Sequence, residues 1–329
     1  MKRRFLSLLL AVAVLLAVFL SVRLGHVSLG TGDVFRALKG NGNPTHTRIL
    51  LEIRLPRALL GVLVGGGLAL SGSVFQALLR NPLAEPYILG ISGGSAAGAV
   101  LVLSLGLVTV SSVLLPAAAF AGALLAIVLV FRVAASADRS LDVRVLLLAG
   151  VVVGSFFTAV IALLLSISEA QAVRSAVLWM MGSLAGASWT RVLLVAGYTL
   201  PSGLVLMGMA RSLNLLSIGE ETAGYLGTDV ERVKRTAYGV ASLITAAGVA
   251  VAGIIGFVGL IVPHALRLIV GSDQRLLLPL SFLAGAAFLT SADLVARLIL
   301  DPSEVPIGVI TAFLGVPLFL VLLRRSLSP

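Results

Sequence analysis

The sequence contains no cysteine, and only 12% of its residues are charged, about half the share of an ordinary soluble domain. The first absence excludes disulfides and thiolate metal sites. The second, together with 59% hydrophobic residues and a mean hydropathy of +1.11, predicts an all-α polytopic membrane protein. No stretch is polar enough to form an aqueous domain, so we expect one transmembrane domain over residues 1–329 and any soluble machinery on other chains.

Several functional patterns are missing as well. The sequence has no His-Glu-x-x-His motif and no Gly-x-x-x-x-Gly-Lys-Ser/Thr nucleotide loop, so an enzyme is disfavoured and any ATPase must be a partner. Its three histidines, His26, His46 and His264, lie far apart without ligand spacing, and we expect no metal site. The chain itself is expected to hold no cofactor.

Carboxylates are absent from the centres of the apolar segments, where an ion-coupled carrier would need them. Asp293 and Glu169 lie near segment ends. An ion-coupled secondary transporter or a channel remains the alternative function, distinguished by transport that needs no ATPase. The net charge of +10 is assigned to cytoplasmic loops, which carry the positive charge of membrane proteins, and no nucleic-acid partner is expected.

Uncharged runs mark the expected spans, because about 20 apolar residues are needed to cross a bilayer. The ten expected spans cover residues 5–24, 58–79, 90–108, 114–133, 145–168, 191–211, 236–255, 257–270, 276–297 and 305–323. The first is interpreted as an uncleaved span rather than a signal peptide, because its apolar run is long and no cleavage pattern follows. Both termini are expected in the cytoplasm.

Orientation decides two ambiguous segments. If residues 169–188 crossed the membrane, the basic cluster at 232–235 would lie outside, against the positive-inside bias, so we expect a helix on the outer side. Residues 236–266 are expected to cross twice, with a break at Gly253, Gly256 and Gly259, because a single crossing would leave the C-terminal arginines outside.

The stretch "RNPLAEPYILGISGGSAAG", residues 80–98, then falls between spans 2 and 3 on the cytoplasmic side. Pro82 and Pro86 stop a helix and disfavour it at the residue before each. Irregular backbone at membrane depth is tolerated only where it is buried in protein or lines a cavity. The residues alone leave two interpretations open, a tight turn and a constriction at the inner mouth of a pathway.

Four motifs resemble one known family. They are residues 53–98, beginning "IRLPR", with "ETAGYLG" at 221–227, "AGIIGFVGLIVPHALRLIVGSDQRLLLP" at 252–279 and "EVPIGVITAFLGVPLFLVLLRR" at 304–325. In this order they resemble the FecCD-type permeases of ABC importers for iron chelates and cobalamin, over essentially the whole chain. The resemblance implies a ten-helix BtuC-like subunit of a type II importer, paired in a homodimer around a central pathway in the bacterial cytoplasmic (inner) membrane.

The same resemblance implies partners and cargo. Two cytoplasmic ATPase subunits would bind ATP and Mg²⁺, and a periplasmic or lipid-anchored binding protein would deliver the substrate. The substrate would be a metal chelate, with a ferric siderophore as first expectation and cobalamin or haem close behind. This chain would catalyse no bond chemistry.

Site residues follow from the resemblance position by position. Arg54 and Arg57, placed in an outer loop, and Arg297 would dock glutamates of the binding protein. A cytoplasmic gate would lie at Asn81, Pro82 and Leu83, with a second constriction at Ser140 and Leu141. Residues 213–235 would form a coupling loop of two short helices that fit the ATPases, with these residues at its core: Gly219, Glu220, Glu221, Thr222, Ala223 and Gly227.

Overall fold

The computed structural model describes residues 2–25, 27, 29–137 and 142–327, and in that part of the chain every regular element is helical. The eight long helices are α1 (Lys2–Arg23), α4 (Leu55–Leu78), α6 (Leu114–Ala137), α7 (Val143–Ser166), α9 (Trp189–Gly208), α12 (Val230–Ala252), α14 (Gln274–Leu298) and α15 (Ile307–Leu327). The shorter α-helices are α2 (Thr31–Leu38), α3 (Pro44–Arg48), α5 (Ile91–Ser104), α8 (Ala170–Met180), α10 (Ala210–Ile218), α11 (Glu220–Tyr225) and α13 (Val258–Val270). A π-helical turn η1 (Ile49–Arg54) and two 3-10 turns, η2 (Pro86–Leu89) and η3 (Leu107–Thr109), complete the elements.

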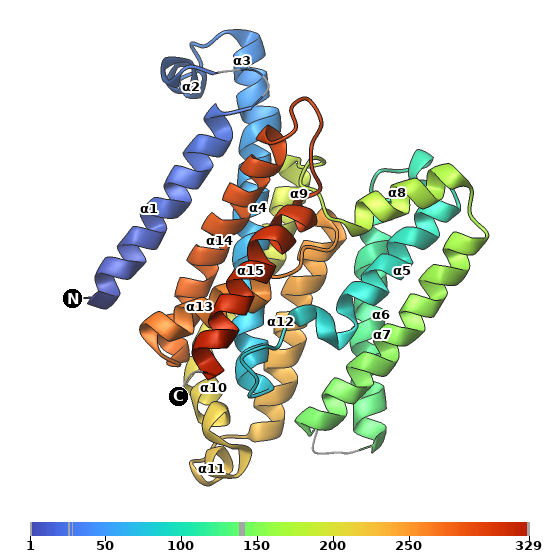
Figure 1. The fold of residues 1–329 in the computed structure, drawn as a ribbon, viewed down its shortest axis with the longest axis vertical. Helices are drawn as coiled ribbons and strands as arrows, with labels where there is room; N and C mark the ends of the chain where they lie inside the picture. The colour runs from blue at the N-terminus through green and yellow to red at the C-terminus, as the bar shows by residue number, and fades with distance from the viewer. Residues whose placement is uncertain (1, 26, 28, 138–141, 328–329) are drawn as a thin grey trace.

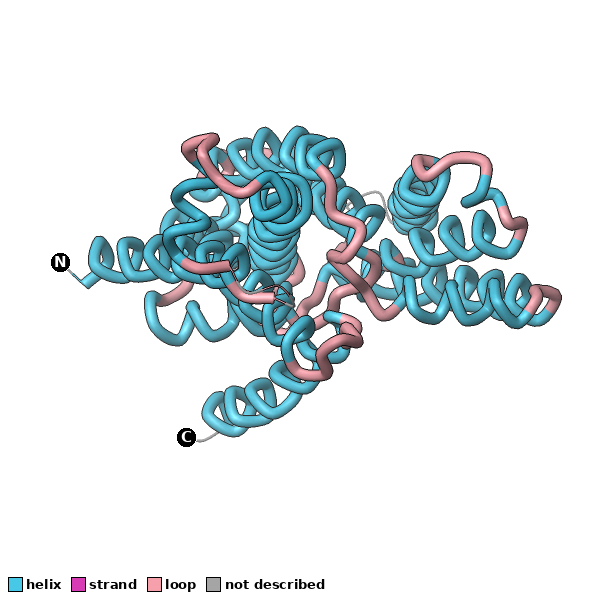
Figure 2. Tube along the Cα trace, turned by 90° about the horizontal axis from the view of Figure 1, so that it is seen from above, coloured by secondary structure: helices cyan, strands magenta, loops and turns pink. Residues whose placement is uncertain are grey.

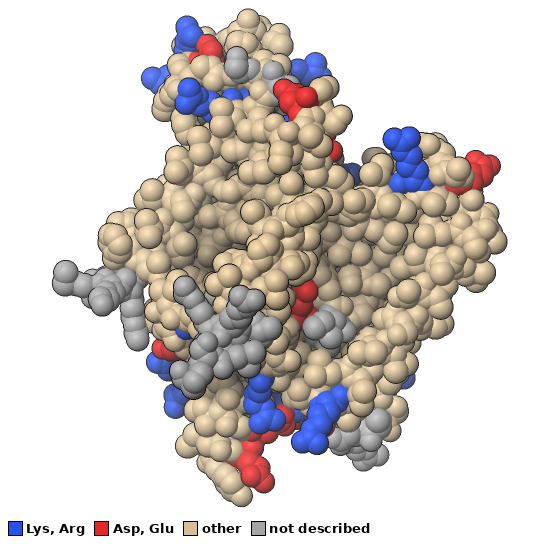
Figure 3. All heavy atoms as spheres, viewed as in Figure 1, with Lys and Arg blue, Asp and Glu red and all other residues tan. Residues whose placement is uncertain are grey.

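Ten of these helices overlap the ten expected spans. Among the described residues, seven helices are long and apolar enough to cross a membrane, and α5, α13 and residues 307–321 of α15 are shorter apolar stretches. Most charged side chains on the face shown in Figure 3 gather at its two ends, and the broad region between them is mainly uncharged, with an acidic patch near its middle. The predicted all-helical membrane fold is confirmed.

Helix α4 forms the centre of the bundle. It packs against α14, α12, α13 and α9, and nearly all of its residues are buried. Glycines permit this packing: a Cβ on Gly65 would lie 2.3 Å from the carbonyl oxygen of Gly285 on α14, and one on Gly72 would lie 1.9 Å from that of Gly259. Around this core, α1 lies along α14, and α5, α6 and α7 form a lobe on the opposite side (Figure 1).

The two ends of the bundle differ in structure. We call the end that carries α2 and α3 the outer end and the end that carries α10 and α11 the inner end, following the sequence prediction (Figure 1). In the perpendicular view the N- and C-terminal helices project from the periphery of the bundle (Figure 2). Helix α8 lies within the segment 169–188, which the orientation argument assigned to an outer-side helix rather than to a span.

Three boundary predictions need correction. Arg54 and Arg57, expected in an outer loop, lie in η1 and α4. The helical segment begins at Pro44, because Asn43 accepts a hydrogen bond from Thr45 N–H and Pro44 occupies the first helical position. The predicted break in 236–266 spans only residues 253–257. Gly259 lies inside α13, where it permits close contact with Leu68 and Pro86. Helix α5 ends at Ser104, not residue 108.

Candidate functional site

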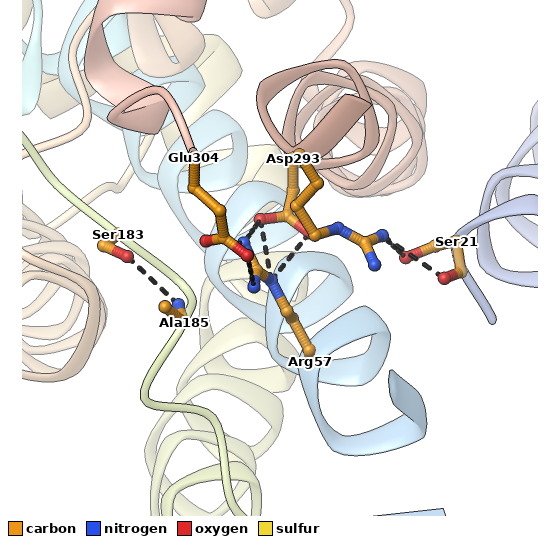
Figure 4. A network of polar contacts seen from close by, with 7 residues as sticks. Ser21, Arg57, Ser183, Ala185, Asp293 and Glu304 are labelled. Atoms are coloured by element: carbon orange, nitrogen blue, oxygen red, sulfur yellow. Dashed lines mark hydrogen bonds and ion pairs between the residues drawn. The ribbon is translucent and has the colours of Figure 1, made fainter. Parts of the chain in front are cut away.

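A cluster of buried charges lies at the outer end. Arg57 on α4 donates to both carboxylate oxygens of Asp293 on α14, at 2.9 and 3.1 Å. It also donates to both oxygens of Glu304, before α15, at 2.8 and 2.9 Å. Figure 4 shows the Arg57 side chain reaching between these two carboxylates. Bidentate, charge-assisted bonds of this kind are the strongest that arginine makes.

The other two predicted docking arginines complete the cluster. Arg297 lies one turn beyond Asp293, with its Nε 3.1 Å from an Asp293 oxygen, and it donates to the hydroxyl and carbonyl oxygens of Ser21 on α1. Arg54 donates to the carbonyl oxygens of Val22, Arg23 and Val27, at 2.5 to 3.0 Å. It thereby holds the outer end of α1 against α4.

The structure brings the three arginines together but also buries them. Arg54, Arg57 and Arg297 are 5%, 8% and 5% exposed. The cluster contains three guanidinium groups and two carboxylates, so it keeps one excess positive charge. Sequence reasoning missed Asp293 and Glu304 as partners of Arg57.

The predicted gate turn follows α4 at the inner end. Asn81 Oδ1 accepts a hydrogen bond from Leu83 N–H at 2.9 Å, and the Asn81 carbonyl accepts one from Ala84 N–H at 3.1 Å. Leu83 packs in an apolar cluster with residues of α13 and α15. Residues 81–83 therefore form a tight turn against α13 and α15, the first of which follows the unwound segment 253–257. The second predicted gate position, Ser140 and Leu141, lies outside the described residues.

Between these ends lies an apolar cavity of about 610 Å³. It is lined by the end of α8, the break between α12 and α13, and α15, including Met180, Met181, Phe257 and Phe313. No charged side chain is among its lining residues. Its lining therefore offers apolar contact surface.

Two side chains that follow the gate turn bond to the unwound segment 253–257, between α12 and α13. Glu85 Oε1 accepts a hydrogen bond from Phe257 N–H at 2.7 Å, and Tyr87 Oη bonds both the N–H and the carbonyl of Ile255. Burial raises the pKa of the Glu85 carboxyl, and the bond from Phe257 offsets part of that effect. Burial also raises the pKa of Tyr87. Sequence reasoning did not single out either residue, although Glu85 is the only charged residue between Arg80 and Arg132.

One pattern in this region has catalytic spacing but not catalytic surroundings. Residues 90–94 read Gly-x-Ser-x-Gly, which in hydrolases places a serine on a turn between a strand and a helix. Here Ser92 lies in the first turn of α5 and follows a 3-10 turn. The spacing therefore does not indicate a nucleophile.

At the inner end, α10 and α11 are two short helices, as the resemblance implies. Gly219 joins them with φ 150°, and Gly227 ends the second with φ 81°, conformations that favour glycine. Ala223 is buried, whereas Ile218, Tyr225 and Leu226 are 70%, 89% and 61% exposed. The tip of this helix pair is thus an uncovered apolar surface.

A partly buried ion pair links the helix pair to a long helix. Lys234 on α12 donates to both carboxylate oxygens of Glu220, at 2.9 and 3.0 Å, and is 3% exposed. Glu220 begins α11, where the helix dipole also favours its negative charge. Movement of α11 would therefore pull on α12. The sequence had placed both residues in the coupling loop without predicting that they pair.

Known proteins resemble the chain along nearly its whole length. The model of the FecCD transport family matches residues 13–325. A cobalamin import system permease protein BtuC of Halobacterium salinarum is 46% identical over 86% of this chain and 75% of its own. A hemin transport system permease protein HmuU of Yersinia pestis is 40% identical over 98% and 96%.

Solved structures agree with the fold. A metal-chelate type ABC transporter in an inward-facing conformation superposes with a TM-score of 0.88 at 33% identity, covering 97% of this chain and 98% of the other. PsaBC from Streptococcus pneumoniae, with a TM-score of 0.56 at 19% identity over 82% and 90%, shares the fold alone. This all-helical chain, with its buried outer charges and its paired inner helices, belongs to the FecCD transport family of ABC transporter permeases and is not an enzyme.

Proposed function

We propose that this chain is the permease subunit of a binding-protein-dependent ABC importer that moves a metal chelate into the cytoplasm. The observation that carries the proposal is the apolar cavity, which lies beside an unwound segment between the outer cluster and the gate turn. A wall without charged groups does not hold a large chelate tightly, so release can be fast. ATP and Mg²⁺ are bound by the partner ATPases, and no cofactor is held here.

The membrane is the cytoplasmic (inner) membrane, with both termini inside, and a second copy of this chain completes the pathway. Support for a homodimer comes from α15, which borders the cavity and leaves Phe313, Leu314 and Val316 at least 44% exposed. A second subunit would cover this apolar surface. The mass of the detergent-purified complex, with two permease copies and two ATPases, would test the stoichiometry.

Transport assays test the function itself. The permease, its ATPases and its binding protein are reconstituted in vesicles and offered labelled ferric siderophores, cobalamin and haem. We expect ATP-dependent uptake of one chelate class. Ferric siderophores are tested first, and cobalamin and haem are tested in parallel. Uptake that follows an ion gradient and persists without the ATPase would show a secondary transporter instead.

Docking of the binding protein is proposed at the outer cluster. Because Arg57 and Arg297 already share Asp293, Arg54 supplies the excess charge that a partner carboxylate would neutralise. We expect Arg54→Glu and Arg297→Glu to weaken binding-protein affinity about tenfold or more. Arg48→Glu is the control, since Arg48 is exposed and paired with Glu52. Unchanged affinity in Arg54→Glu, Arg57→Glu and Arg297→Glu would refute docking at the cluster.

Coupling to the ATPases is proposed at the inner helix pair. The exposed Tyr225 and Leu226 offer apolar surface to a groove on each ATPase, and Gly219 and Gly227 allow the sharp bends between helices. Glu221 and Thr222 follow Glu220 in the first turn of α11. We expect the ATPase to copurify with the parent chain and to be lost from a Tyr225→Asp variant.

A further inference from the structure

The unwound segment 253–257 needs partners for its backbone, because nothing at membrane depth bonds exposed N–H and C=O groups except protein or cavity water. Helix α12 ends at Ala252 and α13 begins at Val258. Between them, the N–H groups of Ile255 and Phe257 are bonded by side chains that follow the gate turn. The wall of the cavity is therefore held from behind by residues 85 and 87.

The bonding is specific in geometry. Tyr87 Oη donates to the Ile255 carbonyl at 2.8 Å and accepts from the Ile255 N–H at 3.2 Å, so it bonds both backbone polar groups of one residue. Phe257 adopts φ 70°, an uncommon conformation for a residue with a side chain, and its N–H points at Glu85. A strained conformation of this kind persists only where its surroundings determine it.

A third side chain joins the turn to the same helix. Gln76, 2% exposed near the inner end of α4, donates to the carbonyl oxygen of Leu260 at 3.0 Å. Its amide also lies 3.5 Å from the carbonyl oxygen of Ala84, the residue that follows the gate turn. The gate turn, the unwound segment 253–257 and the start of α13 are thus bonded to one another through buried and partly buried groups.

We propose that Glu85 and Tyr87 are positioning residues that make the gate turn, residues 81–83, and the cavity wall, residues 253–257, move as one unit. The proposal rests on the proposed function, in which the turn is a gate. When the turn shifts, the two side chains carry the wall with it, so the cavity changes shape as the gate opens. Neither residue is assigned a contact with cargo.

The hydrogen bond, rather than the negative charge, is what Glu85 contributes. A glutamine keeps an acceptor oxygen at the same distance, whereas an alanine removes it. If the charge itself acted on cargo or on a coupling ion, glutamine would fail as completely as alanine. Glu85→Gln therefore separates a positioning role from an electrostatic one.

The absence of cysteine makes the movement measurable. Leu83→Cys on the turn and Ile254→Cys on the wall are introduced singly into the reconstituted complex, and their rates of labelling by a maleimide are compared with and without ATP. We expect both rates to change with nucleotide in the parent and in Glu85→Gln. In Glu85→Ala with Tyr87→Phe, the Leu83→Cys rate still responds, but the wall response falls about tenfold, as expected for lost buried hydrogen bonds.

Transport gives a second readout. The ratio of chelate imported to ATP hydrolysed should fall about tenfold in Glu85→Ala and be restored by Glu85→Gln. Glu169→Ala, at an exposed carboxyl before α8, is the control and should keep both the labelling pattern and the ratio.

The proposal would be overturned if the labelling rate of Ile254→Cys responded to nucleotide equally in every variant. It would also be overturned if Glu85→Gln lowered the ratio of chelate imported to ATP hydrolysed as far as Glu85→Ala does. Labelling needs no chelate, so a parent complex that imports none while its labelling still responds would refute the proposed function alone.

Discussion

At the scale of single residues, Asp293 holds the outer cluster together. Its carboxylate is 2% exposed and serves both Arg57 and Arg297. Such a pair contributes little net stability compared with apolar packing, yet removing one member leaves a buried charge without compensation. The cluster is therefore sensitive to loss of either sign of charge.

Asp293→Asn should consequently lower the free energy of unfolding by about 3 to 5 kcal/mol. Thermal unfolding of the purified chain in detergent measures the effect. The matched change Glu52→Gln removes an exposed carboxylate paired with Arg48, a contact worth at most about 1 kcal/mol, and should leave the unfolding temperature nearly unchanged. Equal unfolding temperatures for the two variants would contradict this account.

Glu85 makes stability depend on pH. Because burial raises its pKa in the folded chain, the folded state keeps a proton that the unfolded state loses, and the free energy of unfolding falls as pH rises above the ordinary value of 4.5. We expect Glu85→Gln to unfold at or above the parent temperature at neutral pH, with the difference shrinking below that ordinary value. An unfolding temperature clearly below the parent's at neutral pH would show that Glu85 is stabilised by its charge.

At the scale of helices, close packing of α4 depends on glycine where two backbones meet. A Cβ on Gly285 would lie 2.3 Å from the Gly65 carbonyl oxygen and 2.4 Å from the Ala69 Cβ. Backbone atoms cannot yield as flexible side chains do. The two helices would have to separate to admit even a methyl group.

Gly285→Ala is therefore expected to destabilise the chain by about 1 to 3 kcal/mol. Gly197→Ala on α9 is the control, because no atom lies within 4 Å of the added Cβ. That variant should be neutral or slightly stabilising, by about 0.5 to 1 kcal/mol, through the better helix propensity of alanine. The unfolding temperatures of both variants in detergent are compared with that of the parent. A Gly285→Ala chain as stable as the parent would show that α4 and α14 can move apart freely.

The helices were predictable and the polar contacts between them were not. Hydrophobic length is a local property, so uncharged runs located most of the apolar helices, and the positive-inside bias separated α12 from α13. Arg57 lies 236 residues from Asp293 and 247 from Glu304, and no local pattern predicts a contact at that separation. Helix α3 did have local signals, since Asn43 before Pro44 is a typical helix start. Glu85 also had one, as a lone charge in a long apolar region.

At the scale of the whole molecule, a continuous series of contacts joins the inner tip to the cavity. Helix α11 is bound to α12 through Glu220 and Lys234, and α12 leads directly into the unwound segment 253–257. That segment is bonded to Glu85 and Tyr87 after the gate turn. Movement at the tip can reach the gate through rigid helices and buried bonds.

Glu220→Gln should weaken this series at its first link, because Lys234 would remain buried without its carboxylate partner at residue 220. We expect the ATPase to stay bound while chelate imported per ATP hydrolysed falls about tenfold. Glu231→Gln, which removes an exposed partner of Arg235, is the control and should keep the parent ratio. An unchanged ratio in Glu220→Gln would mean that force passes by another route.

The cavity separates the chemistry of its lining from the support of its wall. Met180, Met181 and Phe313 line the space, while the bonds that fix segment 253–257 join its main chain to Glu85 and Tyr87, which are not among the lining residues. Substitutions in the lining can thus accumulate without loosening the wall. A lineage could change its cargo by a few such replacements and keep the same moving parts.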